Sequence, residues 1–243
     1  MTRPTGHTIW RGASLLDGTP IIAIALHRSN NRKTGDMVQT YILREDIDPR
    51  EANKTGADFS ICGACPHRGR PHNLPNKSLA LDRTCYVRID QGPLIVWRAY
   101  QRGNYPAAET PHKRRALGVG RVVRLGTYGD PAAVPAHVWR DLTAHATGHT
   151  GYTHQSASAC NLLMQSADSL PEAQAAWRSG LRTFRIVNKI GDLQPNETLC
   201  PASAEAGHKT TCAKCKLCAG TLVNAKSIAI VAHGNGAGHF KGE

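Results

Sequence analysis

The sequence contains no apolar run of about 18 residues, the length that a helix needs to cross a bilayer. Its first residues, MTRPTGHTIWRG, lack the continuous apolar core of a secretory signal peptide. Internal repeats and low-complexity segments are also absent. We therefore expect no membrane span, no secretion and a cytoplasmic location. With 243 residues, 40% of them hydrophobic, the chain is long enough to bury a substantial core.

Acidic residues are scarce relative to basic ones. The 18 Asp and Glu residues against 30 Lys and Arg give a formal net charge of +12. Such a charge attracts polyanions, so we expect a nucleic acid or a nucleotide as partner. The densest basic run, from His112 to Arg124, fits either a solvated loop that enters a strand or a phosphate-binding patch.

The eight cysteines form two groups and one single residue. The first cysteine group consists of Cys62, Cys65 and Cys85, and the second consists of Cys200, Cys212, Cys215 and Cys218. Because cytoplasmic thiols stay reduced, CxxC spacings there indicate metal binding or catalysis rather than disulfides. Cys160 stands beside an apolar run and is expected to be a small buried side chain.

The spacing C-x11-C-x2-C-x2-C of the second cysteine group predicts a single metal centre. Four thiolates suit a tetrahedral zinc ion, and the CxxCxxC run also occurs among ligands of iron–sulfur clusters. The composition does not choose between zinc and iron. Three nearby lysines would offset part of the thiolate charge, namely Lys209, Lys214 and Lys216.

The first cysteine group has the spacing C-x2-C-x19-C, which leaves two interpretations open. If His67 or His72 supplies a fourth ligand, the group is a closed zinc site. If no histidine does so, three thiolates can hold a 4Fe-4S cluster that leaves one iron open to a substrate or cofactor. We expect Cys85 to complete the pair formed by Cys62 and Cys65.

The pattern of apolar segments predicts an α/β fold. Two β-rich segments around SNNRKTGD indicate a β-hairpin in the N-terminal region, residues 1–58. From Arg121 onward, short apolar strands alternate with helical segments, which predicts parallel strands in a partial or complete β/α barrel or an open doubly wound sheet. We assign the barrel-like core and the first cysteine group to residues 59–190. The four-cysteine segment and a final strand occupy residues 191–243.

Functional groups collect at the carboxyl ends of parallel strands. That rule selects residues that follow the predicted strands: Thr127, Tyr128, Gly129, Asp130, Tyr152, His154, Ser166, Asp168, Asn188 and Lys189. Asp130 precedes Pro131 in GTYGDP, so it is either a turn or helix-cap carboxylate or a ligand for a cationic group.

The order of these pieces resembles the radical-SAM superfamily, particularly divergent phage-encoded members of the spore photoproduct lyase branch. The resemblance covers about residues 59–190 and is carried by the cysteines ahead of CYV, by RVVRLGTYGDPAAVPAHVWRDL and by LLMQSADSLPEAQAAWRSGLRTFRIV. It implies that the first cysteine group holds a 4Fe-4S cluster with S-adenosylmethionine. The second group would then hold zinc or an auxiliary cluster. The family's CxxxCxxC motif is replaced here by a pair and a third cysteine much further along the chain.

The resemblance also implies roles for residues near the first cysteine group. Gly129 and Asp130 would lie near the amino group of the cofactor's methionine. The candidate catalytic residues are Asp130, Tyr128 and His154, and the candidate cofactor-binding residues are Gly129, Asp130 and Ser166. The location would be the cytoplasm of a bacterial host if the chain is phage-encoded.

Three functional hypotheses follow. The first is a radical-SAM-like iron–sulfur enzyme that acts on a nucleic acid or a nucleotide. The second is a non-enzymatic zinc protein of phage or mobile-element type that binds DNA or RNA. The third is hydrolysis by a metal-activated water held by Asp130, His145, His149 and His154, which no HExxH motif or paired carboxylates support.

Overall fold

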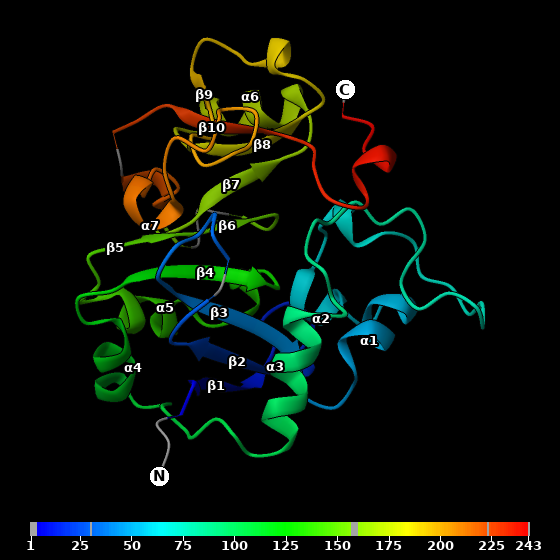
Figure 1. Ribbon diagram of the computed structural model, residues 1–243, viewed down its shortest axis with the longest axis vertical. Coiled ribbons are helices and arrows are strands. Elements are labelled where there is room, and N and C mark those ends of the chain that lie inside the picture. Colours follow the sequence, from blue (N-terminus) through cyan, green and yellow to red (C-terminus); the bar gives the residue numbers. More distant parts are fainter. Residues whose placement is uncertain (1–3, 30, 157–159, 223, 243) are drawn as a thin grey trace.

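Two five-stranded sheets form the framework of the computed structural model, which describes residues 4–29, 31–156, 160–222 and 224–242. The first sheet has the order β1-β2-β3-β4-β5, with strands Gly6–Ala13, Pro20–Leu26, Met37–Arg44, Val122–Tyr128 and Gly148–Thr150. The second has the order β6-β7-β8-β10-β9, with strands Tyr152–Thr153, Met164–Ala167, Thr183–Val187, Ser227–Val231 and Glu197–Leu199. Figure 1 shows the first sheet in the lower half and the second above it.

The strand directions confirm the α/β class. Strands β1, β2 and β3 are antiparallel neighbours, which confirms the N-terminal hairpin. From β3 onward every neighbouring pair in both sheets is parallel. The described strands make two separate sheets, and closure into a barrel is not shown. The chain passes from the first sheet to the second at Gly151, between β5 and β6, where a side chain would collide with Leu163 and Leu125.

Seven α-helices are described: α1 (Pro49–Thr55), α2 (Phe59–Cys62), α3 (Gly92–Gln101), α4 (Pro111–Gly118), α5 (Ala136–Thr143), α6 (Leu170–Arg178) and α7 (Cys212–Cys215). The main apolar core lies around the first sheet, where the continuous run Ile21–Ala25 of β2 is fully buried. A strand with this pattern must be covered on both faces. A smaller core around Ile228 and Ile230 supports the second sheet.

The first half of the basic run from His112 to Arg124 is helical rather than a loop, and of its basic side chains Arg114 is buried whereas His112, Lys113 and Arg115 are exposed. Residues up to Gly118 form α4, whose first turn is capped by Thr110 and begins with Pro111. Arg114 is buried and forms an ion pair with Asp141 of α5, with an Nη2 to Oδ2 distance of 3.0 Å. This ion pair therefore links α4 to α5.

Candidate metal and ligand site

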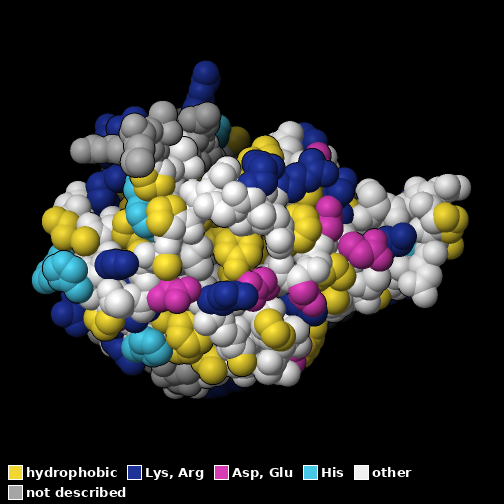
Figure 2. Space-filling model, turned by 90° about the horizontal axis from the view of Figure 1, so that it is seen from below, with side chains coloured by type: hydrophobic (Ala, Val, Ile, Leu, Met, Phe, Trp, Pro, Cys, Tyr) yellow, Lys and Arg dark blue, Asp and Glu magenta, His cyan; other side chains and the backbone are white. Residues whose placement is uncertain are grey.

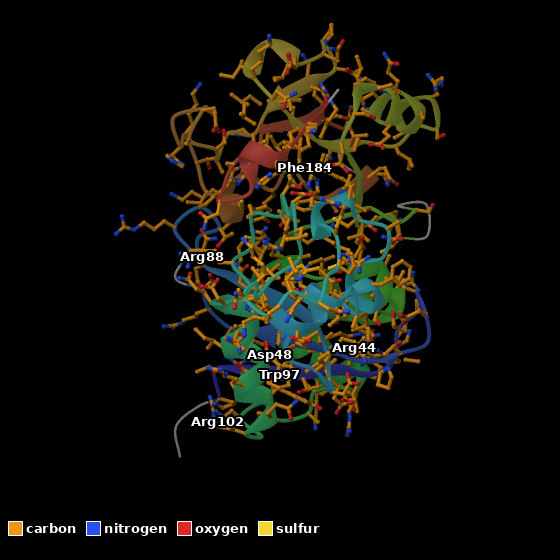
Figure 3. The ribbon with its side chains drawn as sticks, turned by 90° about the vertical axis from the view of Figure 1, so that its right-hand side faces the viewer. Arg44, Asp48, Arg88, Trp97, Arg102 and Phe184 are labelled. Atoms are coloured by element: carbon orange, nitrogen blue, oxygen red, sulfur yellow. The ribbon has the colours of Figure 1, made fainter. Side chains whose placement is uncertain are left out.

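A cavity of about 390 Å³ lies between the two sheets, and strands of both sheets contribute to its wall. Six cysteines line it, three from each group: Cys62, Cys65, Cys85, Cys200, Cys212 and Cys218. The wall also contains Phe184 of β8. Figure 3 shows this side chain in the upper half of the molecule, far from Trp97 of α3 and from Arg102, which follows that helix.

Local hydrogen bonds bring the first cysteine group together across the long spacing. Cys62 ends α2, and Gly63 follows with φ +55°, a left-handed conformation that turns the chain toward Cys65. The residues from Arg70 to Leu81 form an extended arm that is closed at its base by two backbone hydrogen bonds between those residues. The Cys85 amide then donates to the His67 carbonyl over 3.1 Å. The chain thus returns to its starting point, and all three cysteines reach the cavity.

Neither histidine considered as a fourth ligand is directed at these sulfurs. The Nε2 atom of His72 bonds the Leu79 carbonyl over 2.8 Å within the arm. His67 bonds Thr84 through Nδ1 and Asp168 through Nε2, both over 2.6 Å. The imidazole that approaches the group is instead His154, whose Nε2 lies 4.0 Å from the Cys65 sulfur.

His154 and His67 share the carboxylate of Asp168. The Oδ1 atom of Asp168 lies 2.6 Å from the Nε2 atom of His67, and its Oδ2 atom lies 3.1 Å from the Nε2 atom of His154. Burial acts to raise the pKa of Asp168, but the two imidazoles outweigh it and hold that pKa below its usual range. Burial acts to lower the pKa of His154, and its bonds to Asp168 and Cys65 nevertheless raise it well above the ordinary value. Both directions favour a positively charged His154 paired with the Asp168 carboxylate, beside Cys65.

Backbone hydrogen bonds to three separate segments of the chain hold the second cysteine group in place. Cys200 follows β9, and its amide donates to the Ala229 carbonyl of β10 over 2.8 Å. The hairpin tip supplies the carbonyl of Lys33, which accepts from the Cys212 amide of α7 over 2.9 Å. The Cys218 carbonyl accepts from Gly151, at the point where the two sheets meet. The cations nearest these thiols include Lys33 and Arg124, which the sequence pattern did not indicate.

One buried arginine holds the backbone around this group. Arg182 donates four hydrogen bonds of 2.7–2.9 Å to main-chain carbonyls, those of Leu217, Gly220, Ala225 and Lys226. These bonds fix the chain between the last cysteine and β10.

The positions of the thiols can be compared with the spacing that a zinc site requires. Four sulfurs at about 2.3 Å from a tetrahedral zinc ion lie about 3.8 Å from one another. In the described chain, three ligand atoms mutually within 4.8 Å are found only in the set His67, His154 and Asp168. Neither cysteine group reaches the zinc spacing. A cubane cluster requires wider spacing, because each of its cysteines binds a different iron.

Burial raises the pKa of several thiols, most strongly for Cys62 and Cys218, and neighbouring cysteines add to this effect. Without a metal ion these side chains are therefore neutral thiols at neutral pH. Metal binding must displace their protons.

Most of the remaining candidate residues line the cavity, among them Tyr128, Gly129, Asp130 and Ser166. Asn188 and Lys189 are exposed and lie outside its wall, as does Cys215 of the second cysteine group. The carboxylate of Asp130 accepts from the Thr153 hydroxyl over 2.6 Å and from the Ala132 and His154 amides, each over 2.9 Å. It thereby holds β6 against the turn after β4. Gly129 has φ +81°, and a side chain there would meet Ile42 at 2.7 Å, so packing alone requires glycine.

Two hydroxyl groups in the cavity wall have no hydrogen-bond partner among the described residues. They belong to Tyr128, which is 4% exposed, and Ser166, which is 9% exposed. An unpaired buried hydroxyl costs about 1–3 kcal/mol.

The four residues proposed for a hydrolytic metal do not meet. His145 is exposed beyond the end of α5, and His149 bonds the Leu162 carbonyl through Nε2 over 3.1 Å. Sequence reasoning also missed Arg124 as a cavity residue. Its signal was a charged residue in the otherwise apolar strand VVRL.

The charge on the surface concerns the expected nucleic-acid or nucleotide partner, and the helices concern the expected absence of a membrane span. On the face seen in Figure 2, basic and acidic side chains lie next to one another, and no continuous basic patch covers it. None of the described helices combines the length and the apolar character needed to cross a membrane.

Comparison of the chain with protein-family models, with curated proteins and with solved structures gives no match.

Proposed function

We propose that this chain is a radical-SAM-like iron–sulfur enzyme, of phage or mobile-element type, in which both cysteine groups hold metal centres beside one cavity. The observation that carries the proposal is that three cysteines from each group line the same cavity. Structural zinc sites are closed by four protein ligands and need no shared cavity.

The first cysteine group fits a three-cysteine cluster with S-adenosylmethionine. No described histidine other than His154 approaches its sulfurs, which leaves a coordination position for a ligand. The cavity volume lies within the roughly 300–1,000 Å³ of small-molecule sites. Bound together, cluster and cofactor would supply reductive cleavage of the sulfonium bond.

The protein's own residues would position and protect this chemistry. Cys62, Cys65 and Cys85 would be the cluster ligands, and the enclosing walls would exclude water. Asp130 fixes the His154 amide and so places the imidazole beside Cys65. A positively charged His154, held by Asp168, would stabilise negative charge on that sulfur. The positive net charge favours a nucleotide or a nucleic acid as substrate.

Anaerobic purification with iron and sulfide analysis tests the proposal. We expect a brown protein with charge-transfer absorption and reductive release of methionine from S-adenosylmethionine. Cys85→Ser should lose iron and that activity, whereas the control Cys160→Ser, at a buried cysteine outside both groups, should keep them. A colourless protein with stoichiometric zinc would overturn the proposal and favour the alternative, a zinc-containing DNA- or RNA-binding protein.

A further inference from the structure

Arg124 differs from the other buried arginines of the described chain. Arg114 and Arg185 form ion pairs with carboxylates, and Arg182 donates hydrogen bonds to four main-chain carbonyls. Arg124 is 8% exposed on β4 and has no carboxylate partner among the described residues. Burying such a charge without full pairing costs several kcal/mol, so its retention requires a reason.

The guanidinium group is held in place through one nitrogen only. Its Nη2 atom donates to the phenol oxygens of Tyr86 and Tyr152, over 2.5 Å and 3.2 Å. The Nε and Nη1 atoms make no hydrogen bond to a described residue, and they are not enclosed by protein. They are therefore open to the cavity that Arg124 lines. Two adjacent free N–H groups of a guanidinium match the two oxygens of a carboxylate or phosphate.

The surroundings of Arg124 suit a small anion that carries an apolar or aromatic part. Tyr152 stacks on Phe184 with ring centroids 4.4 Å apart, and both rings face the same cavity. Lys33 adds a second positive charge to the wall. Tyr86 is 38% exposed, so the cavity reaches solvent beside the guanidinium.

We propose that Arg124 binds the oxyanion, phosphate or carboxylate, of a small molecule held in the cavity between the two cysteine groups. This inference rests on the proposed function, because it takes that cavity as the substrate site, and it adds the chemical class of the substrate. The competing explanation is that Arg124 only balances the charge of the second cysteine group, since Cys212 lies near it.

Binding of phenyl phosphate and benzoate, with phenol as neutral control, tests the inference by anaerobic calorimetry on the metal-loaded protein. We expect at least one of the two anions to bind and phenol to bind far more weakly. The preferred anion identifies phosphate or carboxylate. Arg124→Gln should weaken its binding at least tenfold without loss of metal. Arg124→Lys, which keeps the charge but loses the fork of donors, should give a smaller loss. The control is Arg121→Gln, because Arg121 lies outside the cavity and bonds His27 and Asp36.

The outcomes separate this inference from the proposed function. Metal-loaded protein that binds neither anion, or binds one equally well after Arg124→Gln, overturns the inference and leaves the proposed function intact. Loss of metal in Arg124→Gln with unchanged anion binding identifies the charge-balancing role instead. Protein without iron contradicts the proposed function. If Arg124→Gln does not fold, the wild-type affinities and Arg124→Lys decide.

Discussion

Arg182 offers the sharpest test of how the second cysteine group is held. In Arg182→Met the aliphatic stem remains while the four hydrogen bonds to main-chain carbonyls are lost. A hydrogen bond to a charged group contributes about 1.5–3 kcal/mol, but four bonds from one side chain do not add, and the freed carbonyls regain water. We therefore expect the free energy of unfolding to fall by about 3 kcal/mol.

Urea denaturation measures that loss, and limited proteolysis between Cys200 and Lys226 shows where it acts. The matched control is Arg178→Met, at an exposed arginine in the last turn of α6. If Arg182→Met matches this control in both stability and protease resistance, metal binding alone orders the segment. The role assigned to Arg182 would then be wrong.

Two further predictions concern pairs away from the cavity. Arg185 and Glu197 form a buried ion pair with side-chain exposures of 4% and 0%, so Glu197→Gln should lower the free energy of unfolding by about 3 kcal/mol because it leaves the guanidinium charge unpaired. A loss below about 1 kcal/mol in urea denaturation would contradict this. Burial and the bond to Glu45 raise the pKa of Tyr100 to about 12. Since the unfolded value is lower, the resulting stability is complete below pH 10 and lost as pH rises to about 12. Wild-type protein should therefore lose about 1 kcal/mol more than Tyr100→Phe between pH 9 and pH 12, after allowance for solvent screening. Equal pH dependence of the two proteins would refute it.

Much of the fold could be predicted from local pattern, because apolar periodicity survives in a single sequence. The predicted strand RVVRLG corresponds to β4, and the predicted helix LPEAQAAWRSG corresponds to α6, where Ser169 and Glu172 form a capping box. In the basic stretch KRR, Lys113 and Arg115 are exposed, as a charged run predicts, whereas Arg114 is buried and paired with Asp141 from another helix. Division into two sheets depends on long-range strand pairing, which local periodicity does not encode.

The candidate site could likewise be predicted only in part from the sequence. Cysteine spacing indicated two groups, and strand ends indicated Tyr128, Asp130 and Ser166, all of which line the cavity. The link between His67 and Asp168 joins residues 101 positions apart, and no local signal predicts it. The shared cavity is likewise a property of how the two sheets meet.

The contact between the hairpin tip and α7 has a consequence for the order of events during synthesis. The carbonyls of Lys33 and Thr34 accept hydrogen bonds from the amides of Cys212 and Ala213. The ribosome makes the acceptors first, and it makes the donors, at positions 212 and 213 of the 243 residues, only after nearly nine tenths of the chain. Until then the carbonyls at the hairpin tip lack these hydrogen-bond donors and are exposed to water. The second cysteine group can therefore be completed only late in synthesis, and a nascent chain that ends before α7 would carry the strands of the first sheet without Cys212, Cys215 and Cys218.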